Sequence, residues 1–299
     1  RTTIAMRSGI ISLVGRPNAG KSTLLNRIVG RKIAIVSDKP QTTRNRILAV
    51  KSYPQGQVVF MDTPGIHRPL HRMNVRMVEM ALDSMSQVDA LGVVIDTTES
   101  IGAGDRFLVR LLEQVRIPVV LVLNKIDRVA KSTLLPKMDW YRKQHDFTAL
   151  IPISALDGEG VDDLECLILS QLPEGDVLYP DDSVLDQPER FYVTEIVREK
   201  LLLHTRAEIP FSSAVVMDRF EEMDEKGVMR LYCSILVENS SQKPIVIGRG
   251  GTMIKRIGEG ARVELERFFD ARVYLDLHVK VRANWRENNR VLDDLGLKY

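Results

Sequence analysis

The sequence predicts an α/β domain with a mostly parallel sheet, followed by a smaller α+β domain. Over residues 9–172, short β-branched runs alternate with helical patterns, which is typical of successive βαβ units. Over residues 172–188 this periodicity gives way to a polar, proline-containing stretch, which indicates a linker. The order of expected elements then changes. We therefore expect domains over residues 1–175 and 188–299, joined by a linker over 176–187.

Hydrophobic periodicity places the elements in order. In the first domain we expect strands over residues 10–14, 58–61, 90–95, 119–123 and 150–153, and helices over 22–29, 74–85, 105–114 and 161–172. In the second domain we expect helices over 188–203 and 252–269, strands over 211–221, 228–238 and 272–282, and a short tail helix over 287–295. Helices should cover both faces of the first sheet, and ligands should gather at the carboxyl ends of its strands.

The composition is that of a globular protein with two cores: 299 residues, of which 44% are hydrophobic and 27% charged. A formal net charge of +2 excludes a strong overall field, so a nucleic-acid or membrane site would have to be a local patch. No apolar run approaches the length of a membrane span, and we expect a soluble, cytoplasmic protein. Cys166 and Cys233 lie in apolar surroundings without partners at metal-ligand spacing, so we expect two buried, reduced thiols.

A phosphate-binding loop follows the first expected strand. Residues 15–22 read GRPNAGKS, which fits the pattern GxxxxGK[ST] between a strand and a helix. In such a loop the backbone N–H groups face the phosphates, the lysine reaches the β- and γ-phosphates, and the serine hydroxyl binds Mg²⁺. The nucleotide-binding residues expected here are Gly15, Arg16, Pro17, Asn18, Ala19, Gly20, Lys21, Ser22 and Thr23.

A second motif, DTPG, ends the strand over residues 58–61 and taken alone could be an ordinary turn. Because it stands at the carboxyl end of a buried strand, we expect Asp62 to hold Mg²⁺ through water and the Gly65 N–H to face the γ-phosphate. The residues that we place in the nucleotide site here are Asp62, Thr63, Pro64, Gly65 and Ile66.

Two further strand ends are expected to hold the base. The Asp127 carboxylate can accept hydrogen bonds from both N1–H and N2–H₂ of guanine, a donor pair that adenine lacks, so the base should be guanine. Asn124 would brace this loop and Lys125 would lie along the base. After the next strand, the Ala155 N–H is expected to face the guanine oxygen, although that signal is weak alone. The residues placed at the base are Asn124, Lys125, Ile126, Asp127, Ser154, Ala155 and Leu156.

Together these motifs resemble those of the Ras-like, translation-factor class of GTPases. The resemblance implies a P-loop GTPase domain, GTP and GDP as substrate and product, and Mg²⁺ held by Ser22, Thr43 and, through water, Asp62. It places the switch I threonine within QTTR at residues 41–44, where we prefer Thr43 to Thr42. A solvated Ser/Thr connection is the alternative for this loop. The resemblance also makes Lys21, Thr43 and Gly65 the catalytic residues.

One position departs from Ras in a way that bears on the rate. After Gly65, where Ras has the glutamine that orients the attacking water, this chain has Ile66, which offers no hydrogen-bonding side chain. We therefore expect slow intrinsic turnover, with water held by a switch backbone group or by a partner. His67 and Arg68 are candidate substitutes, but we favour a mobile polar loop there.

The second domain contains a glycine loop before an amphipathic helix, and residues 246–257 read VIGRGGTMIKRI. With the α-β-β-α-β order, this resembles a type II KH module, whose GxxG loop clamps single-stranded RNA, although the loop alone could be a helix cap. Ile247, Ile254 and Ile257 are expected to floor a groove for bases. Residues 241–290 contain 11 Lys and Arg against 6 Asp and Glu. Trp285 is either a stacking platform or a cap on the core. The expected RNA-binding residues are Ile247, Gly248, Arg249, Gly250, Gly251, Ile254, Lys255 and Arg256.

A P-loop GTPase followed by a KH module is the arrangement of the Era GTPases, which the chain resembles over nearly its whole length. The matching segments are GRPNAGKSTLLN (15–26), SDKPQTTR (37–44), DTPGIH (62–67), NKID (124–127), ISA (153–155), EIVREKLL (195–202) and VIGRGGTMIKRIG (246–258). The resemblance implies binding of 16S rRNA near its 3′ end and assistance to maturation of the small (30S) ribosomal subunit. It also implies peripheral contact with the cytoplasmic face of the cell membrane, and we expect a monomer. The pair Arg249 and Gly250 departs from the more polar pair common in that loop, which puts its side-chain contacts in doubt.

Two other functions stay open on these residues. One is a GTPase that acts on another RNA, in tRNA modification or on mRNA, and sequencing of crosslinked RNA would distinguish it. The other is a membrane-surface signalling switch, which liposome sedimentation would detect.

Overall fold

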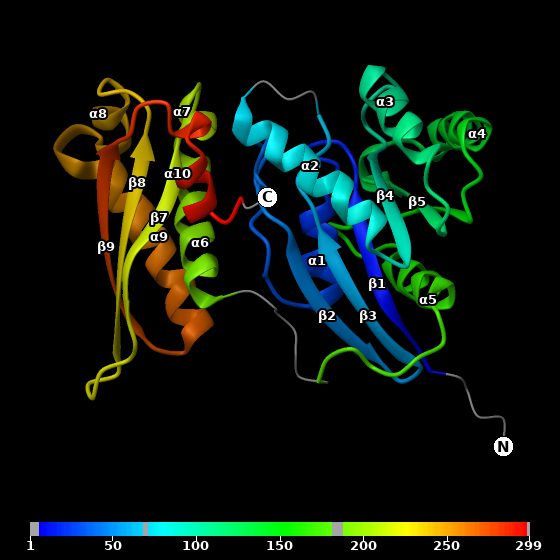
Figure 1. The fold of residues 1–299 in the computed structure, drawn as a ribbon, viewed down its shortest axis with the longest axis horizontal. Helices are drawn as coiled ribbons and strands as arrows, with labels where there is room; N and C mark the ends of the chain where they lie inside the picture. The colour runs from blue at the N-terminus through cyan, green and yellow to red at the C-terminus, as the bar shows by residue number, and fades with distance from the viewer. Residues whose placement is uncertain (1–5, 68–70, 181–187, 298–299) are drawn as a thin grey trace. The chain divides into compact units, whose positions relative to one another are not determined.

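The computed structural model describes residues 6–67, 71–180 and 188–297. The chain forms two compact units, and Figure 1 shows their elements in chain order. Within the described residues, the first unit comprises residues 6–36, 43–67 and 74–180, and the second comprises 37–42, 71–73 and 188–297. Each unit is built on its own sheet.

The first unit contains a six-stranded sheet of order β2-β3-β1-β4-β5-β6 in which β2 is antiparallel to β3 and the other pairs are parallel. The strands are β1 (Arg7–Val14), β2 (Ile47–Tyr53), β3 (Gly56–Asp62), β4 (Ala90–Asp96), β5 (Val119–Asn124) and β6 (Ala149–Pro152). The prediction of a mostly parallel sheet is confirmed. Strand β2 was not predicted, because this half-buried edge strand ends in polar and aromatic residues that interrupt the apolar pattern.

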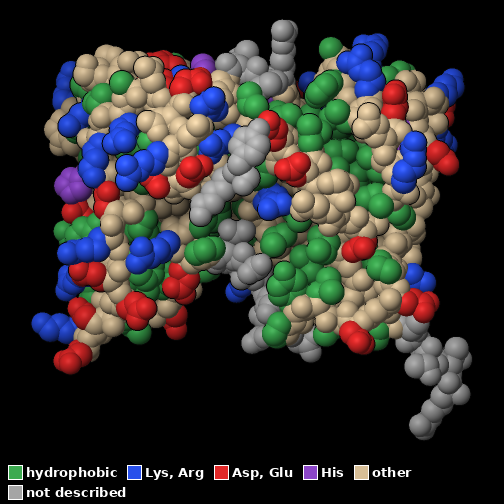
Figure 2. Space-filling view, viewed as in Figure 1, with side chains coloured by type: hydrophobic (Ala, Val, Ile, Leu, Met, Phe, Trp, Pro, Cys, Tyr) green, Lys and Arg blue, Asp and Glu red, His purple; other side chains and the backbone are tan. Residues whose placement is uncertain are grey.

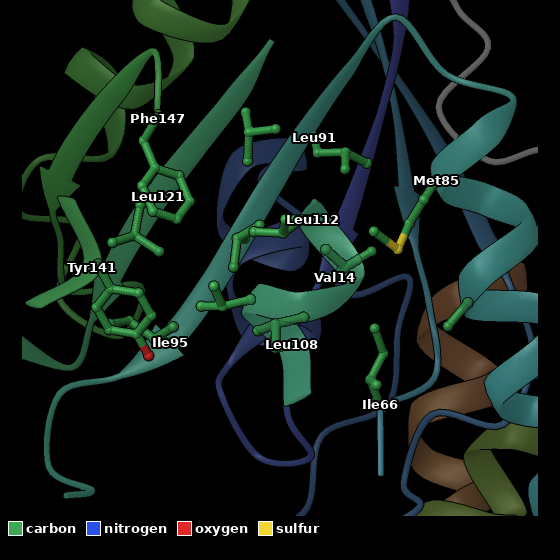
Figure 3. Packing of buried hydrophobic residues seen from close by; sticks show 14 of the residues in the cluster. Val14, Ile66, Met85, Leu91, Ile95, Leu108, Leu112, Leu121, Tyr141 and Phe147 are labelled. Carbon is green, nitrogen blue, oxygen red and sulfur yellow. The ribbon is translucent and has the colours of Figure 1, made fainter. Parts of the chain in front are cut away.

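Helices lie on both faces of this sheet (Figure 1). They are α1 (Lys21–Val29), α2 (Arg72–Ser86), α3 (Ala103–Leu112), α4 (Leu134–Gln144) and α5 (Val161–Gln171). On one face, Leu108 of α3 and Tyr141 of α4 pack with Leu91 of β4 and Leu121 of β5 (Figure 3). On the other face, α1 contacts β2 and β3, and α5 contacts β1 and β3. The covered sheet leaves its carboxyl edge for ligands.

The last described part of the first unit is fastened to β3 by Gln57, which is fully buried. Its Nε2 donates to Ser52 Oγ at 3.1 Å and to the Tyr179 carbonyl at 2.9 Å. Its Oε1 accepts the N–H groups of Leu178 and Tyr179, both at 2.9 Å. Two residues inside the predicted linker are therefore bound to the sheet.

The second unit has a three-stranded sheet of order β7-β8-β9, with β7 and β8 antiparallel and β8 and β9 parallel. Its elements are α6 (Glu189–His204), α7 (Ile209–Ser212), β7 (Ala214–Glu221), β8 (Val228–Val237), α8 (Gln242–Ile247), α9 (Thr252–Phe269), β9 (Arg272–Val281) and α10 (Asn289–Asp294). Helices α6 and α9 pack on the sheet. The expected strand over 211–221 is wrong at its start, because residues up to Ser212 continue the short helix α7, whose second residue is Pro210.

The prediction of two buried thiols is half wrong. Cys233 is buried on β8, whereas Cys166 is exposed on α5. The face of α5 that packs on the sheet carries Leu164 and Ile168, four residues apart, so Cys166 between them points away. Within residues 6–67, 71–180 and 188–297, no helix is long and apolar enough to cross a membrane.

Candidate functional site

The phosphate loop lies between β1 and α1, as the sequence predicts. β1 ends at Val14, and α1 begins at Lys21. The Lys21 side chain is buried, and its Nζ donates to the carbonyl oxygens of Gly15, at 3.4 Å, and Arg16, at 3.2 Å. Burial lowers the pKa of the Lys21 ammonium, and the nearby Asp62 carboxylate opposes this effect. The ammonium is therefore held inside the curl of the loop, where the phosphates of a nucleotide would lie.

Three side chains of the predicted metal site converge beside this loop. Ser22 Oγ donates to Asp62 Oδ2 at 2.5 Å and lies 2.9 Å from Thr43 Oγ1. Asp62 is fully buried, and its Oδ1 has no hydrogen-bond partner among the described residues. Burial raises the pKa of this carboxyl group, although Lys21 and Ser22 oppose the shift, so a cation would favour its charged form. Two hydroxyls and a carboxylate with an unused oxygen are ligands of the kind that Mg²⁺ prefers, so the residues fit the ion.

The two candidate threonines of switch I have different partners. Thr43 Oγ1 lies against Ser22, as described above. Thr42 Oγ1 instead donates to the Lys39 carbonyl at 2.5 Å and lies 2.9 Å from Ser37 Oγ. Only the Thr43 hydroxyl, of the two, is brought to the predicted metal ligands.

The DTPG segment packs directly on the phosphate loop. A Cβ at Gly65 would lie 2.7 Å from the Pro17 backbone, so this close approach requires glycine. The Thr63 hydroxyl donates to the Leu13 carbonyl at 2.8 Å, which is an anchoring role. Ile66 donates its N–H to the Gly15 carbonyl at 2.9 Å, and its side chain is buried in the core shown in Figure 3. Ile66 therefore holds this segment in place and presents no group to a water molecule.

The expectation of a mobile polar loop concerns His67 and Arg68. His67 is half-buried, and its Nδ1 lies 2.8 Å from the Gly65 carbonyl oxygen. Arg68 lies outside the described residues.

The two loops that are predicted to bind the base are joined to each other and to the phosphate loop. Asn124, which is buried at the end of β5, donates its Nδ2 to the Ala19 carbonyl and accepts the Ala155 N–H at Oδ1, both at 2.9 Å. Lys125 has a left-handed backbone (φ 68°), and its Nζ donates to the Asn18 carbonyl at 2.8 Å. Asp127 follows on a short 3₁₀ turn, Ile126–Arg128. The bracing role predicted for Asn124 therefore matches its contacts.

These contacts change the expectation for the guanine oxygen. The Ala155 N–H, which was expected to face that oxygen, is already donated to Asn124. The next N–H along the chain, that of Leu156, donates to no acceptor among the described residues. Leu156 as a residue is 59% exposed. Its N–H is therefore the donor of this loop that is left available in the structure, and it becomes a second candidate for contact with a base.

Two side chains of α1 that no sequence motif assigns a role support the neighbouring loops. On α1, Asn26 Oδ1 accepts the N–H groups of Ile33 and Ala34, both at 2.9 Å. The next residue, Arg27, donates to the carbonyls of Ala155, at 3.2 Å, and Leu156. No local motif marks the Arg27 contacts, because their partners come together only through the tertiary fold.

Two acidic residues are also missed. Asp96, at the end of β4, accepts from Lys125 Nζ at 2.5 Å, and this pairing lowers its pKa against the opposing effect of burial. Asp105, at the start of α3, accepts from Arg16 at 3.1 Å and from the buried Tyr141 hydroxyl at 2.8 Å. Asp96 was detectable, since it stands at a strand end between the other motifs.

In the second unit, the glycine loop separates α8 from α9, which begins at Thr252. Gly248 has φ 76°, and a Cβ there would lie 2.7 Å from the Met253 backbone nitrogen. Arg249, Lys255 and Arg256 are exposed around this loop. The charged residues expected to contact RNA are thus accessible.

The expected apolar floor is partly wrong. Ile247 and Ile254 are half-buried, so their side chains keep exposed surface. Ile257 is fully buried and belongs to the core of the unit. It lies one turn beyond Ile254 on α9, where the helix turns its apolar face to the sheet.

Trp285 is a cap on the core, which decides between the two alternatives for this residue. Its side chain is fully buried, and its indole Nε1 donates to the Ser212 carbonyl at 2.8 Å. A buried ring with its N–H satisfied in this way cannot stack on a base.

Comparisons with known proteins agree with this division of the chain. Residues 10–125 match the family described as 50S ribosome-binding GTPase, and residues 208–286 match the KH domain family. The chain is 46% identical over 290 residues to GTPase Era of Geobacter metallireducens and 49% identical over 290 residues to GTPase Era of Geobacter sp. strain M21. In both pairs, 97% of each chain is covered.

Two solved structures extend the similarity to the whole fold. A point variant of Aquifex aeolicus Era bound to GDP and AlF₄⁻ is 38% identical, with 98% of this chain and 100% of that chain covered and a TM-score of 0.94. Era in complex with MgGDPNP and nucleotides 1506–1542 of 16S ribosomal RNA is 39% identical, with the same coverage and a TM-score of 0.95. The identity, the coverage and the paired GTPase and KH domains together place this chain in the Era GTPase family.

Proposed function

We propose that this protein is a slow GTPase switch that binds 16S rRNA near its 3′ end and assists maturation of the small ribosomal subunit. The single observation that carries the catalytic part is the convergence of Ser22, Thr43 and the buried Asp62 beside Lys21. These residues would hold Mg²⁺, which would stabilise the negative charge that develops during hydrolysis. The GDP and MgGDPNP complexes of similar Era proteins support this assignment.

Slow turnover follows from the position after Gly65. Ile66 is buried and uses its N–H within the protein, so neither its side chain nor its amide can orient water. Lys21, Thr43 and the Gly65 backbone remain as the groups of this chain that would face the γ-phosphate. The intrinsic rate should then stay low until a partner or a change in the switch segments supplies the missing contact.

The paired threonines give a matched test of the metal site. Thr43→Ala should weaken binding of a non-hydrolysable GTP analogue with Mg²⁺ about tenfold and slow hydrolysis about a hundredfold, since a ligand of the ion is lost. GDP binding should change less than twofold, because switch I is expected to hold Mg²⁺ in the GTP state. Isothermal titration and phosphate release measure these effects. The control is Thr42→Ala, and an equal or larger loss in that variant would contradict the assignment of Thr43.

For RNA, we propose that the loop over residues 248–251 binds the ribose-phosphate backbone. Support comes from the exposed Arg249, Lys255 and Arg256 beside it, and from the similar Era protein that was solved with a 16S rRNA segment. Figure 2 shows both Lys and Arg and Asp and Glu side chains on the visible face of the second unit. Basic charge next to small residues lets phosphates approach the chain closely.

A matched pair of glycines tests the RNA site. Gly250 and Gly227 both have positive φ, 59° and 72°, and a Cβ at either meets nothing within 4 Å. Aspartate tolerates this conformation, so Gly250→Asp and Gly227→Asp should both fold. Gly250→Asp should weaken binding of RNA with the sequence of 16S nucleotides 1506–1542 at least tenfold, by repulsion of phosphate. Gly227→Asp should change it less than twofold. Equal affinities of the two variants in a filter-binding assay would contradict the site.

The remaining expectations rest on the family resemblance: a partner in the 30S subunit, a monomeric protein and peripheral membrane contact. The domain boundaries at residues 175 and 188 also remain a proposal, which was made from the sequence. Sedimentation of the protein with purified 30S subunits would test the first expectation, and recovery of tRNA or mRNA in place of 16S rRNA after crosslinking would favour the alternative RNA targets.

A further inference from the structure

We infer that Arg27 is a positioning residue for guanine recognition, which acts by fixing the peptide that carries the Leu156 N–H. This inference rests on the proposed placement of the base between Asp127 and the loop over residues 154–156. Arg27 lies on α1, and its partners lie about 130 residues further along the chain, after β6. Only the tertiary fold brings them together.

The geometry follows from the planarity of the peptide bond. The Ala155 carbonyl and the Leu156 N–H are opposite edges of one planar trans unit, so they point in opposite directions. Arg27 Nε donates to that carbonyl at 3.2 Å. A donor that holds the oxygen on the α1 side therefore directs the Leu156 N–H away from α1.

The neighbouring peptides are held as well. On the preceding one, the Ala155 N–H is donated to Asn124 Oδ1 at 2.9 Å. On the following one, the Leu156 carbonyl accepts from a terminal nitrogen of Arg27. Asn124 and Arg27 thus hold the peptides on either side of Leu156. Over residues 154–158, the Leu156 N–H is the one backbone donor without an acceptor among the described residues. A donor that is fixed before the ligand arrives costs less ordering entropy on binding.

Arginine suits this role better than lysine would. Its planar guanidinium presents several N–H donors in a fixed arrangement, so one side chain can hold two consecutive carbonyls. The helix that carries it also carries Lys21 and Ser22 at its first turn. Arg27 itself is exposed, so its effect on affinity should be moderate because water competes for the same carbonyls.

The test compares three nucleotides that differ at the base, in the presence of Mg²⁺. GDP has both the 6-oxygen and the 2-amino group, and IDP lacks the 2-amino group. 2-Aminopurine riboside diphosphate lacks the 6-oxygen and, with it, the proton on N1. Arg27→Ala should lower the affinity for GDP and for IDP about fivefold each. Its affinity for the analogue without the oxygen should stay within 1.5-fold of the wild-type value. Isothermal titration calorimetry of the full-length protein measures all three.

Two further variants separate positioning from charge. Arg27→Lys keeps the positive charge at this position but cannot hold both carbonyls. It should therefore weaken GDP binding about threefold and leave binding of the analogue unchanged. Arg31→Ala removes an exposed arginine just beyond the same helix and should leave all three affinities within 1.5-fold.

Several outcomes would overturn the inference. A fivefold loss for all three nucleotides in Arg27→Ala would show a general scaffold role, and an unchanged GDP affinity would show no role. Either result would leave the proposed GTPase function intact. If the wild-type protein bound the analogue as tightly as GDP, the placement of the guanine oxygen at Leu156 would itself be wrong, and this inference with it.

Discussion

Asp127→Asn is expected to lower the affinity for GDP about a thousandfold and to make XDP the preferred nucleotide. In the proposed site, the Asp127 carboxylate would accept two hydrogen bonds from guanine, at N1–H and at the 2-amino group. In asparagine one of these acceptors becomes an NH₂ donor, which would face the 2-amino group and leave two donors unpaired. Xanthine carries an oxygen at that position, so the same NH₂ group finds an acceptor. Titration calorimetry with GDP and XDP measures the reversal.

The reversal of preference distinguishes a change in base recognition from damage to the loop. Asp139→Asn, at an exposed position on α4, is the matched control and should leave both affinities within twofold. Loss of GDP binding without any gain for XDP would mean that Asp127 supports the loop and does not contact the base.

The second large effect is expected at Lys21. Lys21→Ala should reduce the single-turnover rate of GTP hydrolysis about a thousandfold, because a fixed positive charge beside the γ-phosphate is removed from a buried site. The contacts of Lys21 within the loop explain why the expected loss of rate is so large. The ammonium is already desolvated and aimed by two carbonyls, so it needs little reorganisation as charge develops. Phosphate release at saturating Mg²⁺ and GTP measures the rate.

Lys143→Ala, which removes an exposed lysine in the last turn of α4, serves as the control and should hydrolyse GTP at the wild-type rate. A loss smaller than tenfold in Lys21→Ala would contradict a direct role in stabilising the transition state. The charge would then serve chiefly to hold the loop.

The grouping of three motifs was predictable because each follows a buried strand, β1, β3 or β5. Parallel strands of a βαβ sheet bring their carboxyl ends to one edge, so Lys21, Asp62 and Asn124 were expected together, and the structure places them together. The pattern of β-branched runs gave the strands that carry them. The antiparallel edge strand β2 gave no such signal.

Contacts between distant loops could not be predicted in this way. Arg27 looks like any exposed arginine of an amphipathic helix, and nothing local links it to Ala155. The burial of Ile257 depends on the sheet under α9, which a helical pattern alone does not locate. Nor could the sequence show that the Ala155 N–H is donated to Asn124, because that contact depends on tertiary geometry.

Helix α1 contributes side chains to several parts of the nucleotide site at once. Its nine residues carry the phosphate and metal groups at the first turn, Asn26 on the approach to switch I, and Arg27 on the base loop. A ligand fragment that immobilises one end of this helix also partly orders the loops at the other end. By thermodynamic linkage, each of two fragments then raises the affinity of the other by the same factor. Guanosine and pyrophosphate should therefore bind cooperatively as separate molecules, each tightening the other without a covalent bond between them.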